Sequence, residues 1–265
     1  MPSHLVMTLS ALVALLPACL TAPRAAARDG VFWATLGLAV VVPVLTVVGL
    51  MGGSWRTDFG TALWLSVAAC LTVFAALAIA SRTAARLAPL LLPYLLGLGV
   101  LATVIGQPPE PSFAPAAPPQ WVVLHIGLSI MTYALLTLAA AAALGVLLQE
   151  RALKRKHPTG LSRLLPPVAD GNELQWRLLM ACVVVLGLGV VTGMATGHFD
   201  RGRLLWLDHK TLLSLLTLVV VIGLLAVHHR SGLRGRRATW PVLVAYILLS
   251  LAYLGVKFVT DVLIG

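Results

Sequence analysis

The sequence has little charge for its length. Of 265 residues, 11% are Asp, Glu, Lys or Arg, whereas 59% are hydrophobic. Soluble globular domains carry roughly 25% charged residues, so this chain has too little polar surface to cover a water-soluble fold. The shortage of charge excludes a soluble enzyme, a secreted disulfide scaffold and a disordered regulator. The composition therefore indicates an integral membrane protein, and the lipid bilayer is an expected partner.

Aromatic residues and paired cysteines are also scarce. Aromatic side chains make up 6% of the chain, and the apolar runs are long, which favours membrane helices over a membrane barrel. The three cysteines, Cys19, Cys70 and Cys182, each lie in an apolar run, and none belongs to a CxxC pair. The sequence therefore argues against thiol redox exchange and against covalent heme attachment to the chain's own cysteines.

Eight apolar segments are long enough, or nearly so, to cross about 30 Å of hydrocarbon as helices. They cover residues 5–21, 31–51, 61–80, 87–106, 121–148, 178–197, 211–227 and 240–259. We expect an all-α, polytopic membrane bundle of eight transmembrane helices that forms a single integral-membrane domain over residues 1–265.

The basic residues give an orientation. The first apolar segment has no Lys or Arg before it and has Arg24 and Arg28 after it, which is the reverse of a signal peptide, so we expect a retained span. Threading the chain from there puts fourteen of the 19 Lys and Arg residues on one side. They are Arg24, Arg28, Arg82, Arg86, Arg151, Lys154, Arg155, Lys156, Arg163, Arg177, Arg230, Arg234, Arg236 and Arg237. The positive-inside rule assigns this side to the cytoplasm and both termini to the outside of a bacterial inner membrane.

This distribution also explains the net charge of +10 without a nucleic-acid partner. The basic residues sit in short loops between spans, where they orient a membrane protein. We therefore expect a multi-pass plasma-membrane protein that does not bind nucleic acid.

Few ionisable residues lie in or near the spans, and each is a candidate functional residue because charge and polarity are costly in hydrocarbon. His125 lies four residues inside Trp121, about 6 Å below the expected outer interface. Its imidazole could ligate a metal, or it could hydrogen-bond a neighbouring helix and fix the packing. Gly189, Gly193 and Gly197 form a ridge that predicts close helix contact and indicates nothing about chemistry.

His209 opens the seventh span from the same face as His125. Two imidazoles at similar depth on neighbouring helices could supply both axial ligands of a heme iron. Trp206 and Asp208 precede His209, and Asp208 could orient a ligand histidine or simply cap the helix. His228 lies 19 residues beyond His209, about 28 Å along the helix, so it cannot share that iron. It marks a heme-entry point at the inner face or extends the basic cluster.

Several segments resemble a known family when taken in order. Residues 121–134, which include His125, resemble the histidine-bearing span of the cytochrome c assembly family, the heme-handling membrane proteins of the CcsA and HemX type. Residues 206–210 and the span ending at His228 are similar to the family's tryptophan-rich segment and following helix. Residues 252–259 resemble the last span of short eight-helix, YpjD-like members. The resemblance covers roughly residues 121–259.

The resemblance implies that His125 is an outer-face heme ligand and that His228 is the family's inner-end histidine. This chain keeps one tryptophan, Trp206, in the tryptophan-rich segment and has His209 where the longer members have proline. It also stops after the eighth span and lacks their further external histidine. These departures favour an accessory or heme-trafficking role over complete ligation of heme to apocytochrome.

We therefore expect a heme-binding inner-membrane protein that assists cytochrome c assembly or heme trafficking by holding a b-type heme near its outer face. His125 and His209 are the expected iron ligands, and His228, Trp206 and Asp208 are further heme contacts. Cytochrome c maturation components are the expected protein partners. The chain offers no nucleophile or general-base constellation, so we do not expect an enzyme. The alternative is a heme-free structural or regulatory membrane partner.

Overall fold

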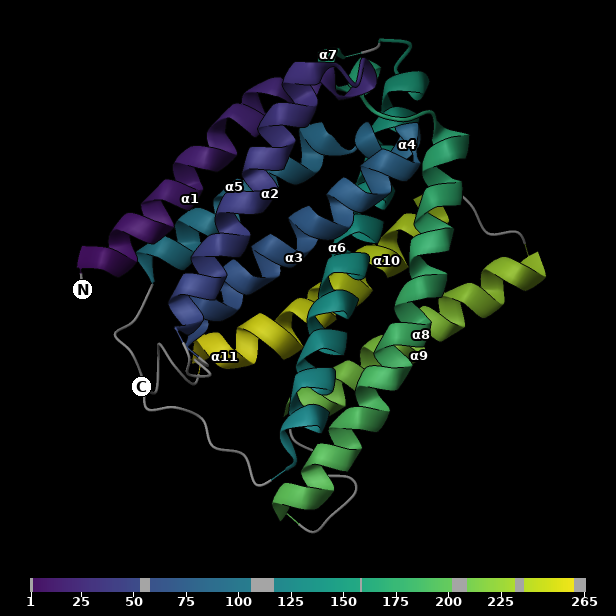
Figure 1. Ribbon diagram of the computed structural model, residues 1–265. Coiled ribbons are helices and arrows are strands. Elements are labelled where there is room, and N and C mark those ends of the chain that lie inside the picture. Colours follow the sequence, from purple (N-terminus) through teal and green to yellow (C-terminus); the bar gives the residue numbers. More distant parts are fainter. Residues whose placement is uncertain are drawn as a thin grey trace.

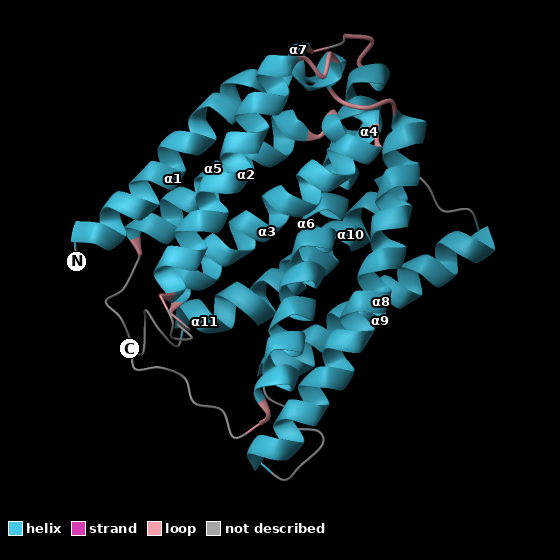
Figure 2. Ribbon diagram, viewed as in Figure 1, coloured by secondary structure: helices cyan, strands magenta, loops and turns pink. Residues whose placement is uncertain are grey.

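The protein is an all-helical bundle. The computed structural model describes residues 2–52, 58–105, 117–157, 159–201, 209–231 and 236–259, and none of these residues lies in a strand (Figure 2). In hydrocarbon, backbone N–H and C=O groups find no water, so they must be paired within helices. The expected class is confirmed: this is an all-α, polytopic membrane bundle.

The described chain forms eight long helices and five short elements (Figure 1). The long helices are α1 (Pro2–Thr21), α2 (Gly30–Met51), α3 (Phe59–Ala80), α5 (Ala88–Val104), α6 (Pro119–Lys154), α8 (Val168–Arg201), α9 (His209–Ser231) and α10 (Arg236–Ser250). The short elements are η1 (Ala22–Ala26), α4 (Arg82–Ala85), α7 (Gly160–Leu164), the π-helical η2 (Leu251–Gly255) and α11 (Val256–Phe258).

Seven helical stretches of the described chain are long and apolar enough to cross a membrane. The last of them joins α10, η2 and α11 into one stretch, Thr239–Phe258. The remaining apolar helix, α5, has 17 residues and is about 25 Å long, at the lower limit for a crossing. The crossing by α5, and with it the total of eight, remains a prediction.

Two aspartates define where α2 and α3 begin. Asp29 accepts a hydrogen bond from the Phe32 N–H (2.8 Å), and Asp58 accepts one from the Thr61 N–H (2.9 Å). A side-chain cap of this kind satisfies one of the first N–H groups of a helix and contributes about 1 kcal/mol. At the other end of α2, Gly52 adopts a left-handed conformation (φ 36°), which terminates the helix at Met51.

Helix α6 is the centre of the bundle. The first group of helices, α1, α2, α3 and α5, packs together on one side of it, and α6 contacts this group mainly through α3. On its other side α6 packs along α8 and against α10, while α9 packs on α8 and α10 (Figure 1). Helix α6 is also the longest, with 36 residues, or about 54 Å.

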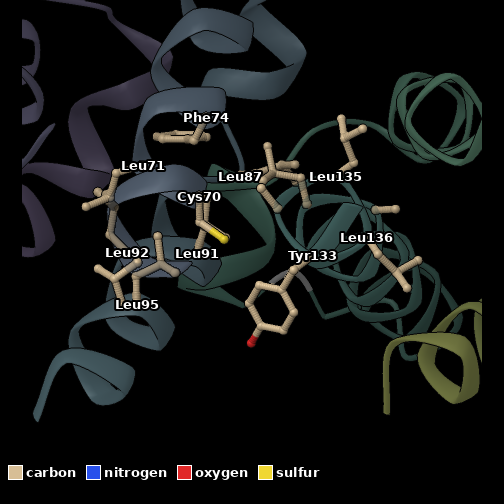
Figure 3. Close-up of a cluster of buried hydrophobic side chains, with 14 of the residues drawn as sticks. Cys70, Leu71, Phe74, Leu87, Leu91, Leu92, Leu95, Tyr133, Leu135 and Leu136 are labelled. Atoms are coloured by element: carbon tan, nitrogen blue, oxygen red, sulfur yellow. The ribbon is translucent and has the colours of Figure 1, made fainter. Parts of the chain in front are cut away.

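A continuous set of buried side chains joins α3, α5 and α6. Cys70, Leu71 and Phe74 of α3 lie beside Leu92 of α5 and Tyr133 of α6 (Figure 3), and these side chains are almost fully buried. Lipid tails are as apolar as leucine, so burial among helices has little hydrophobic driving force in a membrane. Close packing of shapes is therefore what holds this region together.

Three of the basic loops meet at one end of the bundle. Arg28, which follows η1, donates a hydrogen bond to the Ile79 carbonyl at the end of α3 (3.0 Å). Arg86, which follows α4, donates to the Arg163 carbonyl in α7 (3.4 Å). The loops that carry Arg28, Arg86 and Arg163, which the sequence assigned to a common side, thus lie at the same end. The side of the membrane that they face remains a prediction.

The orientation can be tested with reporter fusions. We expect green fluorescent protein to fluoresce when fused after Lys156, because the positive-inside rule places this basic loop in the cytoplasm. Alkaline phosphatase should be active when fused after Gly265, on the outside. The reversed pair of fusions is the control. Active phosphatase after Lys156 with a fluorescent C-terminal fusion would contradict the assigned orientation.

Three tyrosine hydroxyls meet between α5, α6 and α10. The Tyr133 hydroxyl lies 3.2 Å from that of Tyr94 and 3.3 Å from that of Tyr246, and the Tyr94 and Tyr246 hydroxyls are hydrogen-bonded to each other. The fourth tyrosine, Tyr253 in η2, packs its ring against Tyr133 with centroids 5.7 Å apart. All four tyrosines of the chain therefore gather in one cluster, which ties α5 to the C-terminal helices.

We predict that Tyr246→Phe destabilises the bundle by about 1 kcal/mol, a typical value for one interhelical hydrogen bond in a membrane protein. The change removes a hydroxyl that contacts the hydroxyls of Tyr94 and Tyr133. The measurement is the thermal unfolding midpoint in detergent, with the lipid-facing Ile247→Val on the same helix as control. An unfolding midpoint for Tyr246→Phe equal to that of the control would show that the cluster contributes nothing to stability.

Candidate functional site

His125 lies in the second turn of α6 and faces α8. Its side chain is half-buried. Its Nδ1 atom lies 3.1 Å from the Gly189 carbonyl oxygen and 3.2 Å from the Thr192 hydroxyl oxygen, both on α8. The two helices are antiparallel, so the start of α6 and the end of α8 form the same end of the bundle, which we call the His125 end. It is the end expected to face outward.

The glycine ridge of α8 receives the imidazole ring. A Cβ atom at Gly193 would lie 2.9 Å from the His125 Cε1 atom, closer than carbon atoms pack. Gly189 is also buried against α6, where a Cβ atom would meet Leu128 at 3.9 Å. The sequence predicted close helix contact along this ridge, and the structure shows which side chain makes it at Gly193. The space there is filled by His125.

Two further histidines lie at the His125 end. His209 is the first residue of α9, which begins where the chain returns after α8, and it is exposed. His198 lies near the end of α8, is exposed, and makes an edge contact with Phe199 at 6.3 Å between ring centroids. Sequence reasoning missed His198 because the sixth span was expected to stop at Gly197, whereas α8 continues to Arg201.

The structure brings His125 and His209 to the same end of the bundle, on helices that both pack against α8. A single iron shared by the two imidazoles remains a prediction. Trp206 and Asp208, the other expected members of this site, lie outside the described residues.

His228 lies at the opposite end. Because α9 is one helix from His209 to Ser231, His228 is about 28 Å from the helix start, as the spacing predicted. Its ring stacks on Trp176 of α8, with centroids 3.6 Å apart and an interplanar angle of 20°. The neighbouring Gln175 is fully buried, and neither polar atom of its amide has a hydrogen-bond partner among the described residues. Sequence reasoning missed both α8 residues, although a glutamine beside a tryptophan at the edge of an apolar run was visible.

The comparisons with known proteins give the family of the chain. A family model described as "Cytochrome C assembly protein" matches residues 35–264, from within α2 to the C-terminal end. The chain belongs to the cytochrome c assembly family. The match includes most of the first group of helices, so the family relationship extends well beyond the expected residues 121–259.

Individual family relatives differ in how much they cover. An "Uncharacterized 28.8 kDa protein in nifR3-like 5'region" of Azospirillum brasilense is 49% identical over the full length of both chains. "Inner membrane protein YpjD" of Escherichia coli K12 is 31% identical, over 54% of this chain and 53% of that protein. "Protein HemX" of Brevibacillus brevis is 31% identical, over 62% of this chain and 61% of that protein. No solved structure matches the chain.

A histidine at the His125 end can be compared with what metal ions and heme iron require of a protein. Among the described residues, no group of three or more His, Cys, Asp or Glu side chains is placed to hold a metal. Structural and catalytic metal ions in proteins usually need three or four such ligands. Heme iron receives four nitrogen ligands from the porphyrin and needs only one or two axial side chains. An isolated histidine within an apolar helix pair meets that requirement.

Proposed function

We propose that this protein binds a b-type heme at the His125 end and assists cytochrome c assembly or heme trafficking in the bacterial inner membrane. The observation that carries the proposal is an imidazole held inside a membrane-spanning helix pair of a cytochrome c assembly family protein. Ionisable residues in such positions are costly and usually serve function. The family description, "Cytochrome C assembly protein", and the name of the relative "Inner membrane protein YpjD" support the same direction.

Each residue at the site has a simple task. His125 would ligate the iron from α6, and His209 would ligate it from the start of α9. Trp121 and Leu124, which flank His125 on α6, remain exposed, so apolar surface is available beside the imidazole for a porphyrin face. Trp206 and Asp208 are proposed to contact the porphyrin and to orient the His209 ring. When bound, heme would itself be the group that is delivered, with its iron still held by the porphyrin, to a cytochrome.

His228 is proposed as a separate heme contact. Its position at the opposite end rules out a shared iron with His209, and its stack on Trp176 gives it a fixed aromatic neighbour. A heme that crosses from the cytoplasmic side would meet this pair first. The competing explanation, that His228 extends the basic cluster that begins at Arg230, needs no cofactor.

The protein is proposed to hold and deliver heme rather than to catalyse a reaction, with cytochrome c maturation components as its partners. One observation favours a second function, that of a heme-free structural or regulatory partner. The two contacts of His125 with α8 already satisfy one ring nitrogen and tie two helices together. In that case His125 would serve packing alone, and the bundle would stabilise another membrane complex.

A difference spectrum separates the two functions. We predict that protein purified in mild detergent from heme-replete cells shows the Soret and alpha bands of b-type heme in a reduced-minus-oxidised spectrum. His125→Ala should lower the heme content per protein at least about tenfold, because it removes an axial ligand held in place by α8. His209→Ala and His198→Ala then identify which exposed histidine supplies the second ligand. The matched control is His157→Ala, an exposed histidine that follows α6 at the opposite end.

The absence of heme bands after reconstitution with hemin would overturn the heme proposal. If the bands are present and His125→Ala retains them unchanged, the ligand assignment is wrong although the protein binds heme. If the protein binds no heme, capture of a stable partner by it would support the structural function.

A further inference from the structure

We propose that α8 fixes His125 in a single tautomer, with the proton on Nδ1 and the lone pair on Nε2, so that Nε2 is the atom that ligates iron. Gly189, Thr192 and Gly193 are then positioning residues, which act on the iron through His125. The inference deepens the proposed heme function and rests on it. It also gives chemistry to a glycine ridge from which the sequence predicted only helix packing.

The first step is the contact with Gly189. A backbone carbonyl oxygen accepts hydrogen bonds and cannot donate one. At 3.1 Å from this oxygen, the His125 Nδ1 atom must therefore carry a hydrogen. An unprotonated Nδ1 would point its lone pair at the carbonyl lone pairs and be repelled.

The contact with Thr192 leads to the same conclusion. The Thr192 hydroxyl oxygen lies 3.0 Å from the Leu188 carbonyl and 3.0 Å from the Gly189 carbonyl, so its one hydrogen is donated back to its own helix. Toward His125 the hydroxyl oxygen acts as an acceptor. The Nδ1–H is thus shared between two oxygens of α8.

The second ring nitrogen is left with a lone pair. A doubly protonated, charged imidazole is costly within the hydrocarbon region, so a neutral ring with one hydrogen is the favoured form there. With that hydrogen on Nδ1, Nε2 is a free base, and it has no hydrogen-bond partner among the described residues. Metal-ligating histidines commonly donate their other ring N–H to a carbonyl in this way, which sets the tautomer and the ring orientation.

Gly193 makes the arrangement sterically possible. A Cβ atom there would lie 2.9 Å from Cε1, 3.4 Å from Nδ1 and 3.7 Å from Nε2 of His125. Any side chain at this position would push the ring away from α8 and from the Gly189 carbonyl. Gly187, six residues earlier on the same helix, has nothing within 4 Å of the equivalent Cβ position. It is therefore a matched control that adds the same methyl group without touching the ring.

The first experiment reads the tautomer directly and needs no heme. The heme-free protein is labelled with 15N-histidine, reconstituted in lipid nanodiscs, and examined by NMR that correlates ring nitrogens with ring hydrogens. The His125 signals among the seven histidines are identified by their loss in His125→Gln. We expect a protonated Nδ1 and an unprotonated Nε2. A hydrogen on Nε2 in the wild-type protein would overturn the inference.

The second experiment compares Gly193→Ala with Gly187→Ala. Alanine is a better helix former than glycine, so neither change should break α8. Gly193→Ala should displace the ring, give a mixture of tautomers and weaken hemin binding by about 10- to 100-fold, the usual cost of losing an outer partner of a ligand histidine. Gly187→Ala should match the wild type in both measurements. Thr192→Val removes one acceptor and keeps the Gly189 carbonyl, so its effect should be smaller than that of Gly193→Ala.

The failures of the two proposals are distinguishable. If the wild-type protein shows the Nδ1–H tautomer but binds no hemin, the positioning of His125 by α8 stands and the heme function fails. If hemin binds through His125 but Gly193→Ala binds it as tightly as Gly187→Ala, the heme function stands and the positioning role fails. Should Gly193→Ala not fold, the wild-type tautomer and Thr192→Val still decide the matter.

Discussion

A polar group inside a lipid bilayer has no water to bond with, and the arrangement of this protein depends on that constraint. It forces the backbone into helices, and it makes a buried hydroxyl or imidazole costly unless that group bonds to its own or a neighbouring helix. Tyr94, Tyr133 and Tyr246 meet this demand by bonding to one another across α5, α6 and α10. His125 meets it by bonding to α8. Because hydrophobic burial adds little in lipid, these polar contacts act together with close packing to hold neighbouring helices together.

The features predictable from sequence were those that depend on one segment at a time. The apolar runs predicted the helices, because a run of about 20 apolar residues in lipid can pair its backbone N–H and C=O groups within itself only as an α-helix. The loops that carry Arg28 and Arg86 were assigned to a common side by their charge, and the structure places them together. Each of these conclusions needs only the local sequence and the thickness of the bilayer.

Contacts between helices could not be predicted in the same way, because they depend on how each helix is rotated about its axis. His125 was recognisable as a candidate ligand, but its partners Gly189 and Thr192 lie more than 60 residues away. The four tyrosines are scattered between residues 94 and 253, and nothing in their spacing indicates that they meet. His198 was overlooked for another reason, since α8 extends beyond its apolar run into polar sequence. Trp206 and Asp208 lie outside the described residues, so their membership of the site stays a prediction.

The length of α6 has a mechanical consequence. At about 54 Å, the helix is much longer than the roughly 30 Å of hydrocarbon it has to cross, so more than a third of it is available outside the apolar layer. At the end away from His125, the Gln149 amide donates hydrogen bonds to the carbonyls of Ser162, Leu165 and Pro166, which clamp α6 to the connection around α7. The imidazole and this clamp are thus two points on one stiff rod. A protein that binds the basic loops on one side of the membrane would therefore be mechanically coupled, through α6, to the histidine on the other side.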